Sequence, residues 1–354
     1  MNQENLEKLE KSILNLKEKK HKIYFLVQDT KGNAKASISY IYRLAMSLLK
    51  AGYNPTILHE KPDYVGVGEW LGKEYMESLP HKSIEGTNLE VAPEDFIVVP
   101  ELYGFVMPQL SKLPCGKIVL CQAYDYILET LQPGVSWNQV GFLKCITTSE
   151  TQKEFVSNVM RNISFDILEP LISDKFKKQT LPSKPIITIQ SREQRDTTNL
   201  VKSFYLKFPQ YRWVTFKDMR GLTETQFAEN LKESFLSIWI DELSGYGTFP
   251  LESMKTGVPV VGLVPNLVPS WMNENNGVWV NSKIQIVDYV ADFLQNWLED
   301  NINPNLLVEM DNTVSKLQSE DTFSYQAVNL FESYAKTRLD SFEEQLNKFS
   351  TIEQ

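Results

Sequence analysis

The residues of this chain best suited to chemistry lie in one glycine-rich segment in its second half. Gly245 and Gly247 let the backbone adopt positive φ angles or approach a ligand closely. Pro250 follows at a position typical of a first helical turn, where its fixed φ and missing N–H are tolerated. The main-chain N–H groups of Thr248 and Phe249 would then point into the loop with the positive end of the helix dipole. We therefore predict an anion-binding site whose natural ligand is a phosphate.

A carboxylate beside this loop extends the prediction from a phosphate to a nucleotide sugar. Glu252 lies in the first turn of the predicted helix and is too negative to face a phosphate, but it can accept hydrogen bonds from sugar hydroxyls. The predicted donor-binding residues are Ser244, Gly245, Tyr246, Gly247, Thr248, Phe249 and Glu252. A turn without a ligand is the alternative, because any strand-to-helix turn of this kind needs a glycine.

Apolar runs on both sides of the loop supply the elements that must position it. Residues 235–240 are apolar and partly β-branched, which is typical of a buried strand. Residues 257–262 read Gly-Val-Pro-Val-Val-Gly and predict a further strand after one short helix. This succession of strand, glycine loop, helix and strand is typical of a doubly wound α/β protein.

These residues resemble the donor-binding signature of GT-B glycosyltransferases, particularly glycosyltransferase family 4. That family carries two glutamates around a glycine loop, then an acidic residue, Ala-Met and a Gly-x-Pro-Val-Val run. The matching residues here are Gly245-Tyr246-Gly247, Glu252-Ser253-Met254 and Gly257-Val258-Pro259-Val260-Val261. One departure is that Ser244 stands where the first glutamate is expected, while Asp241 and Glu242 come too early.

Two arginines after the predicted strand at residues 185–191 are the second indication of a site for the donor diphosphate. The resemblance implies that Arg192 and Arg195 occupy the places of two cations that hold the donor diphosphate. Guanidinium groups suit this role because a departing nucleoside diphosphate develops negative charge on its outer phosphate. As an alternative, Arg195 pairs with Glu193, Asp196 or solvent.

Two tryptophans beyond the glycine loop leave two interpretations open. Trp271 and Trp279 could stack on a base or a sugar, or they could pack within the core.

Polar residues also follow the predicted strands of the first half. After the strand at residues 22–27, the resemblance gives Gly32 and Asn33 a contact with donor phosphates or acceptor, and a simple turn is the alternative. Glu101 and Asp125 follow two further strands and are candidates for binding the acceptor or the transferred sugar. A loop cap or turn hydrogen bond is the alternative for each of these carboxylates.

The length of 354 residues favours two domains, each able to bury its own core. The resemblance implies an α/β GT-B fold, with two Rossmann-like domains facing across a cleft and a C-terminal helix returning to the first. A polar, proline-bounded segment at residues 174–184 is typical of a linker. We expect an acceptor-side domain at 1–182, a nucleotide-sugar donor domain at 183–334, and residues 335–354 packed back on the first domain.

Composition and charge exclude several classes. Apolar residues make up 42% and charged residues 23% of the chain, which is ordinary for a globular protein. The formal net charge of −9 argues against a nucleic-acid-binding protein, which would normally be basic. We expect the first twenty residues to be neither a secretory signal nor an anchor, and we predict no transmembrane segment but leave peripheral membrane contact open.

Cysteine and histidine spacing predicts no disulfide framework and no metal site. Cys115, Cys121 and Cys145 are odd in number and lack a Cys-x-x-Cys pair, and the three histidines are scattered. We therefore expect a reduced, cytoplasmic protein without a metal ion or cofactor.

An apolar stripe near the N-terminus predicts a helix with one buried face. Leu6, Leu9, Ile13 and Leu16 recur at helical spacing among charged residues. This stripe either packs on its own domain or forms a homodimer, although it is too short to hold a coiled coil unaided.

The predicted function is a hexosyltransferase-type glycosyltransferase that uses a nucleoside-diphosphate sugar of UDP or GDP type. The resemblance implies retention of anomeric configuration, no metal, and a glycan, lipid-linked glycan or protein as acceptor. An inverting transferase with Asp125 or Glu101 as base is one alternative, and a nucleotide-sugar epimerase is another. A third is a catalytically silent scaffold that retains a nucleotide-sugar site, which the serine at position 244 favours.

Overall fold

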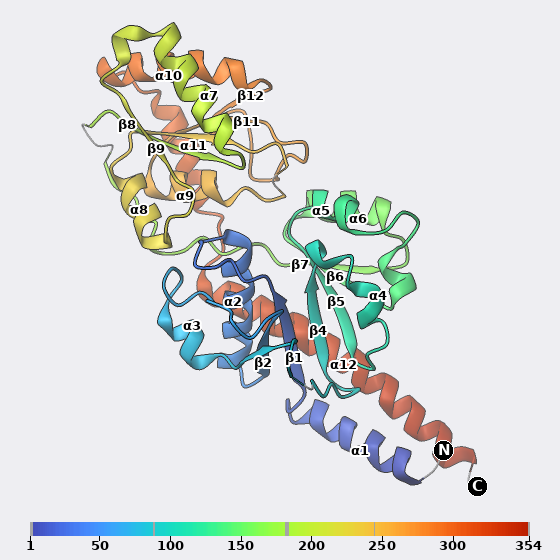
Figure 1. Ribbon diagram of the computed structural model, residues 1–354. Helices are drawn as coiled ribbons and strands as arrows, with labels where there is room; N and C mark the ends of the chain where they lie inside the picture. Colours follow the sequence, from blue (N-terminus) through green and yellow to red (C-terminus); the bar gives the residue numbers. More distant parts are fainter. Residues whose placement is uncertain (1–2, 88, 181–183, 244, 353–354) are drawn as a thin grey trace. The chain divides into compact units, whose positions relative to one another are not determined.

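The computed structural model describes residues 3–87, 89–180, 184–243 and 245–352. They form two compact α/β units, each built around a parallel sheet (Figure 1). Domain 1 comprises Met1–Glu169 together with Asp321–Gln354, and domain 2 comprises Pro170–Glu320. Each has its own hydrophobic core.

Domain 1 contains a seven-stranded sheet of order β3-β2-β1-β4-β5-β6-β7, in which every neighbouring pair is parallel. Its strands are β1 (Lys22–Val27), β2 (Asn54–His59), β3 (His81–Ser83), β4 (Phe96–Pro100), β5 (Gly116–Cys121), β6 (Lys144–Thr147) and β7 (Ser164–Ile167). Its helices are α1 (Gln3–Lys17), α2 (Ala36–Lys50), α3 (Lys73–Ser78), α4 (Met107–Leu110), α5 (Asp125–Thr130), α6 (Glu150–Val159) and α12 (Glu320–Ile352). Short 3-10 turns are η1 (Glu101–Tyr103) and η2 (Trp137–Val140).

Both faces of this sheet are covered, which explains the long apolar runs of its central strands β1 and β4. Along β1, successive side chains point to opposite faces. Tyr24 belongs to the core cluster that includes Trp137 and Phe142, while the neighbouring Phe25 contacts Phe331 of α12, with ring centroids 6.1 Å apart. A parallel sheet buried on both sides reads as continuous apolar runs, as in β1 and β4.

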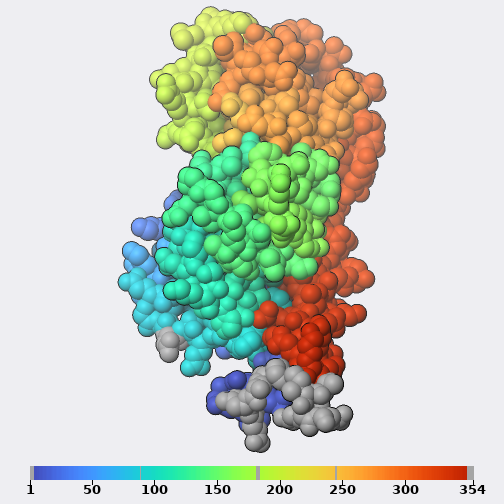
Figure 2. All heavy atoms as spheres, turned by 90° about the vertical axis from the view of Figure 1, so that its right-hand side faces the viewer, coloured from blue at the N-terminus to red at the C-terminus, as the bar shows by residue number. Residues whose placement is uncertain are grey.

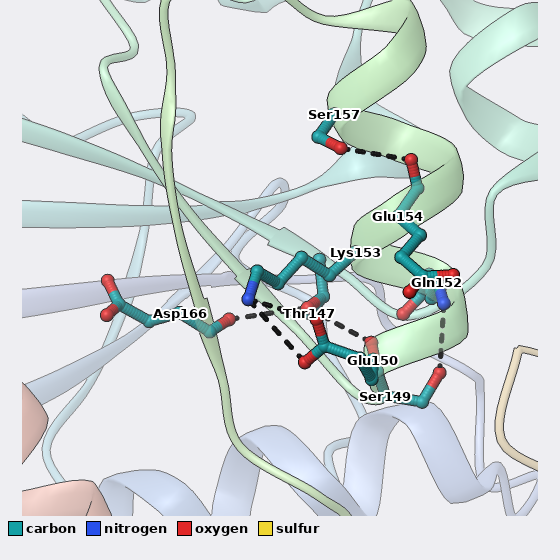
Figure 3. A network of polar contacts seen from close by, with 8 residues as sticks. All are labelled: Thr147, Ser149, Glu150, Gln152, Lys153, Glu154, Ser157 and Asp166. Carbon is teal, nitrogen blue, oxygen red and sulfur yellow. Dashed lines mark hydrogen bonds and ion pairs between the residues drawn. The ribbon is translucent and has the colours of Figure 1, made fainter. Parts of the chain in front are cut away.

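Helix α6 shows how local sequence sets an element boundary in domain 1. The Ser149 Oγ accepts a hydrogen bond from the Gln152 N–H at 3.2 Å, which caps the first turn (Figure 3). The Gln152 side chain reaches back before the helix, where its Oε1 accepts from the Thr148 N–H at 3.0 Å. These side chains therefore provide acceptors for main-chain N–H groups at the start of α6.

Helix α12 returns to domain 1 and runs along it (Figures 1 and 2). The Tyr334 hydroxyl donates to Asp166 Oδ2 at 2.8 Å, and the Arg338 Nη2 donates to the Pro114 carbonyl at 2.6 Å. Phe323 packs edge-on against Tyr40, with ring centroids 5.8 Å apart. The expected return of the C-terminal helix to the first domain is confirmed.

The apolar stripe of α1 is buried within its own chain. Leu9, Ile13 and Leu16 are at most 8% exposed. Ser12 Oγ donates to Glu94 Oε2 at 2.7 Å, and a salt bridge of 2.7 Å joins Lys17 to Glu343 of α12. The first of the two interpretations of this helix therefore accounts for its apolar face.

Domain 2 contains a five-stranded parallel sheet of order β12-β11-β10-β8-β9. Its strands are β8 (Ile186–Ser191), β9 (Thr215–Asp218), β10 (Leu236–Ile240), β11 (Val260–Leu263) and β12 (Val278–Val280). Its helices are α7 (Gln194–Lys207), α8 (Glu224–Lys232), α9 (Thr248–Thr256), α10 (Lys283–Leu298) and α11 (Pro304–Val314), with a 3-10 turn η3 (Pro209–Tyr211).

The two compact units meet in sequence at Glu169/Pro170 and at Glu320/Asp321, whereas the expected limits are 182/183 and 334/335. The Lys255 Nζ donates to the Ile172 carbonyl at 2.9 Å, and the Gln179 N–H donates to the Thr256 carbonyl at 3.1 Å. These bonds attach residues 170–179 to α9, so that this part of the expected linker belongs to domain 2.

Candidate functional site

The topological switch point of the domain 2 sheet lies between β8 and β10. The chain places β9 on one side of β8 and then returns to place β10 on the other. The register pairs Ser191 with Ile240, so Arg192 and Asp241 come next on neighbouring strands. Open α/β sheets bind ligands in the crevice at such a point. The predicted glycine loop therefore leaves the sheet at the position where this fold class forms its sites.

The glycine loop enters α9 through a left-handed residue. Gly247 is the N-cap residue, with φ 76° and ψ 69°, a conformation that favours glycine. Glycine has no side chain with which to cap the helix, and first-turn N–H groups have no acceptor within it. At the other end, Gly257 has φ 86° and stops α9, with its N–H bonded to the Met254 carbonyl at 2.9 Å.

Burial differs along the predicted donor loop. Gly245, Tyr246, Gly247 and Phe249 are buried, and Thr248 and Glu252 are half-buried. The Phe249 ring packs edge-on against Phe227 in the domain core, with centroids 5.6 Å apart. The side chains of Tyr246 and Phe249 are thus part of the core, so their contribution to a ligand would be a main-chain N–H. The predicted site residue Ser244 lies outside the described residues.

Three tryptophans, Trp239, Trp271 and Trp279, form a tryptophan bed against the glycine loop. Their ring centroids lie between 5.8 and 6.5 Å apart. The Trp271 Nε1 donates to the Tyr246 carbonyl at 2.7 Å. A Cβ added to Gly247 would lie 3.0 Å from Trp239 and 3.1 Å from Trp271. The bed therefore fixes the loop backbone from one side. Trp271 and Trp279, for which the sequence left two interpretations, both pack against other residues of the protein.

A buried amide holds the tryptophan bed in place. Asn276 is 0% exposed, and its Nδ2 donates to the Trp271 carbonyl at 2.7 Å and to Thr313 Oγ1 at 3.0 Å. Its Oδ1 accepts from the Trp279 Nε1 at 3.1 Å. Buried amides of this kind need all their partners, so Asn276 links α11 to the bed and, through it, to the glycine loop.

The two predicted arginines differ in their surroundings. Arg192 Nε lies 3.4 Å from Asp241 Oδ1, so the guanidinium turns toward the carboxyl end of β10 and is 33% exposed. Arg195 is exposed on α7 and makes no hydrogen bond or ion pair within the described part of the chain. The structure therefore brings Arg192, and not Arg195, to the strand that carries the glycine loop.

Sequence reasoning missed one cation at this edge of the sheet. Lys283 begins α10, and its Nζ lies 2.9 Å from Asp196 Oδ2 and 3.1 Å from Glu242 Oε1. Helix α10 follows β12, and all strands of this sheet point the same way, so its first residue returns to the same edge. The position of Lys283 directly after β12 was the only sequence signal that could have indicated this contact, because Lys283, Asp196 and Glu242 are far apart in sequence.

The predicted residues of domain 1 lie near its own switch point, between β1 and β4. Glu101 begins η1 after β4 and is 2% exposed. Its Oε1 accepts from the Ala123 N–H at 2.8 Å, and burial raises the pKa of this carboxyl to about 7. Asp125, 8% exposed at the start of α5, adds to that rise through its negative charge. The two carboxylates lie close together, and Glu101 supports the loop between them.

Gly32 and Asn33 lie in the loop after β1. Gly32 has φ 82°, and both the main-chain and side-chain nitrogens of Asn33 donate to the Thr30 carbonyl, at 3.1 and 3.0 Å. The Asp29 carboxylate accepts from the Val65 N–H at 3.2 Å, which ties this loop to the segment after β2. The Asn33 side chain thus closes its own turn, which agrees with the interpretation of this segment as a simple turn.

The described residues contain neither a metal-binding cluster nor a membrane-spanning helix. No group of three or more histidine, cysteine, aspartate or glutamate side chains in them could hold a metal ion. None of the helices drawn from these residues is long and apolar enough to cross a bilayer. The cysteines Cys115, Cys121 and Cys145 are buried and unpaired.

The fold matches several solved glycosyltransferase structures. The sucrose-phosphate synthase of Thermosynechococcus elongatus aligns with a TM-score of 0.64 at 12% identity, over 90% of this chain and 100% of that one. TarM aligns with a TM-score of 0.65 at 10% identity, over 88% of this chain and 98% of that one. Anabaena HepE, in complex with UDP and glucose, aligns with a TM-score of 0.65 at 11% identity, over 88% and 100%. No protein-family model matches the chain, and no curated protein matches it in sequence.

These alignments span both domains and show that the chain has the GT-B glycosyltransferase fold. The expected α/β architecture of two Rossmann-like domains is confirmed. Identities of 10 to 12% establish a fold and do not assign a substrate.

Proposed function

We propose that this protein is a glycosyltransferase that moves a hexose-type sugar from a nucleoside-diphosphate sugar of UDP or GDP type. The observation that carries the proposal is the start of α9 at the switch point, where the N-cap residue Gly247 has no side chain to cap the helix, with Arg192 directed toward the same strand end. The similar structures support the donor class, because HepE was solved with UDP and glucose and also with UDP-glucose. The resemblance to glycosyltransferase family 4 supports the same donor.

In the proposed mechanism, domain 2 stabilises the leaving group. The N–H groups of Gly247, Thr248 and Phe249 bind the diphosphate at the positive end of α9, and Arg192 neutralises charge that develops on the outer phosphate. Glu252 accepts hydrogen bonds from the donor's sugar hydroxyls. Groups fixed before the reaction need no reorganisation when the charge develops, so they lower the barrier. No metal ion takes part in this proposal.

Domain 1 is the proposed acceptor side, with Gly32, Asn33, Glu101 and Asp125 as contact residues. The proposed acceptors are a glycan, a lipid-linked glycan or a protein, and the reaction retains the anomeric configuration. Under retention, an oxygen of the departing phosphate takes the acceptor proton. An inverting reaction would instead use Asp125 or Glu101 as the base, and the anomeric configuration of the product decides between them. A cytoplasmic location, peripheral membrane contact and a homodimer stay predictions.

A melting-temperature screen of the full-length protein against UDP, GDP and their sugars tests the proposal. We expect one nucleotide class to stabilise the protein, because a ligand that binds only the folded state raises its melting temperature. Arg192→Ala and Glu252→Ala should reduce the rise. Arg212→Ala is the matched control, since Arg212 is also an exposed arginine of domain 2.

Two outcomes would contradict the proposal in different ways. If no nucleotide raises the melting temperature of the wild-type protein, the donor site is wrong. If a nucleotide binds but no sugar nucleotide is ever hydrolysed or used for transfer, the protein is a silent nucleotide-sugar-binding scaffold.

A further inference from the structure

Three ion pairs link the segment after β8 to the segment after β10, one of them directly and two through Lys283. Arg192 Nε lies 3.4 Å from Asp241 Oδ1. Lys283 Nζ bridges Asp196 Oδ2 at 2.9 Å and Glu242 Oε1 at 3.1 Å. These contacts lie at the switch point at which the proposed donor diphosphate binds, and neither the sequence motifs nor the proposed mechanism gives Lys283 a role.

The charges of this cluster are arranged so that an anion could replace the carboxylates. Two cations, Arg192 and Lys283, face three carboxylates, those of Asp196, Asp241 and Glu242. The Lys283 side chain is 42% exposed and that of Glu242 is 50% exposed, so solvent screens their attraction. Solvent-exposed ion pairs contribute little to stability, so breaking one costs little.

A diphosphate is a stronger partner for these cations than a solvent-exposed carboxylate. It carries several negative oxygens, and a lysine binds phosphate as a point charge. Asp196 and Glu242 raise the pKa of Lys283, so the ammonium is charged at neutral pH. The two ion pairs also fix the ammonium of Lys283 near the carboxyl ends of β8 and β10. A side chain that is already ordered loses less conformational entropy when a ligand binds.

We propose that Lys283 is a second cation for the donor diphosphate, and that Asp196 and Glu242 hold its ammonium at the site until the diphosphate replaces them. This inference rests on the proposed function. Glu242 is then a competitor of the ligand, although it lies beside the binding loop. Removal of its charge should strengthen nucleotide binding, which a merely structural ion pair would not do.

The test measures binding of UDP and of GDP to the full-length protein by titration calorimetry, and uses the nucleotide that binds more tightly. Lys283→Met should weaken binding about tenfold, and Lys283→Arg should restore most of it. Glu242→Gln should tighten binding by about threefold at low salt, and added salt should reduce that gain because it screens the charges. The corresponding nucleoside, which lacks phosphates, should bind all variants alike.

Lys207→Met is the matched control, because Lys207 also forms an exposed ion pair in domain 2, with Asp288. This variant should bind the nucleotide as the wild type does. If Lys283→Met keeps wild-type affinity, or weakens nucleoside and nucleotide equally, the inference is overturned while the proposed function stands. If wild-type protein binds neither UDP nor GDP, the proposed function fails and the inference fails with it.

Discussion

Glu101 shows how burial changes the chemistry of a single residue. Its carboxyl is 2% exposed, and one oxygen accepts from the Ala123 N–H. Burial raises its pKa from the ordinary value of 4.5 to about 7, since burial penalises the charged form. In the folded protein this carboxyl therefore retains a proton over a pH range in which the unfolded chain has lost it.

This shift predicts a pH-dependent stability difference between wild type and Glu101→Gln. A folded-state pKa above the unfolded value stabilises the protein fully below pH 4.5, and that stability is lost as pH rises through about 7. The glutamine cannot ionise and still offers an oxygen to the Ala123 N–H. We expect equal stabilities near pH 4.5, and a variant more stable by up to about 3 kcal/mol at pH 8.

Urea unfolding at both pH values measures this difference. Glu129→Gln is the control, because Glu129 is exposed on the neighbouring helix α5. A Glu101→Gln variant that is less stable than wild type at pH 8 would contradict a raised pKa for this buried carboxyl.

The sequence predicted some of the site residues better than others. Arg192 could be placed because it directly follows a recognisable strand and precedes a helix, so its backbone position was set locally. Lys283 could not be linked to Asp196 and Glu242, because that contact depends on how three separate βα turns meet at one sheet edge. The contact of 2.9 Å between His59 Nε2 and His81 Nδ1 was missed for the same reason, since it needs the pairing of β2 with β3.

At the scale of elements, the glycine loop and the tryptophan bed form one unit. Gly247 has φ 76°, and its α-carbon faces two indole rings. The turn itself was predictable from Gly-Tyr-Gly followed by Pro250, which specify a loop and a helix start. The bed was not, because two of its rings come from segments that follow α9, and the sequence left them either packing or stacking on a ligand.

Gly247→Ala should be much more damaging than a comparable change elsewhere. The added Cβ would lie about 3.0 Å from Trp239 and 3.1 Å from Trp271. The left-handed backbone costs a non-glycine residue about 1–2 kcal/mol, and overpacking adds about 1–3 kcal/mol. We expect a lower melting temperature and weaker nucleotide binding.

Gly221→Ala separates these two costs. Gly221 has φ 72° in the same domain, and a Cβ there would meet nothing within 4 Å. This control should show the backbone cost alone and leave nucleotide binding unchanged. Equal losses of stability and affinity in both variants would contradict the role of the tryptophan bed.

At the scale of the whole molecule, two separate hydrophobic cores lead us to expect two cooperative unfolding units. The sequence length and the alternation of strands and helices predicted this division, and the fold comparison confirms the GT-B architecture. The limits in the sequence were harder to predict. Bonds such as that from Lys255 Nζ to the Ile172 carbonyl attach residues before the expected boundary to domain 2, and no local pattern announces them.

Phe331→Ala should destabilise domain 1 alone. Phe331 is 1% exposed on α12 and contacts Phe25 of β1. Truncation of a buried phenylalanine costs about 3–5 kcal/mol. In calorimetry we expect two unfolding transitions, and we expect this variant to lower the melting temperature of one of them. Phe204→Ala, which removes a buried ring from domain 2, should lower the other. A single transition that both variants lower equally would show that the domains unfold together.

The central claim is that the start of α9 binds a pyrophosphate. The most direct measurement is a crystal structure of the full-length protein with the tighter-binding nucleoside diphosphate. We expect phosphate oxygens within hydrogen-bonding distance of the Gly247 and Thr248 N–H groups and of the Arg192 guanidinium. A nucleotide whose phosphates bind elsewhere in the protein, with the start of α9 occupied only by solvent, would contradict the account.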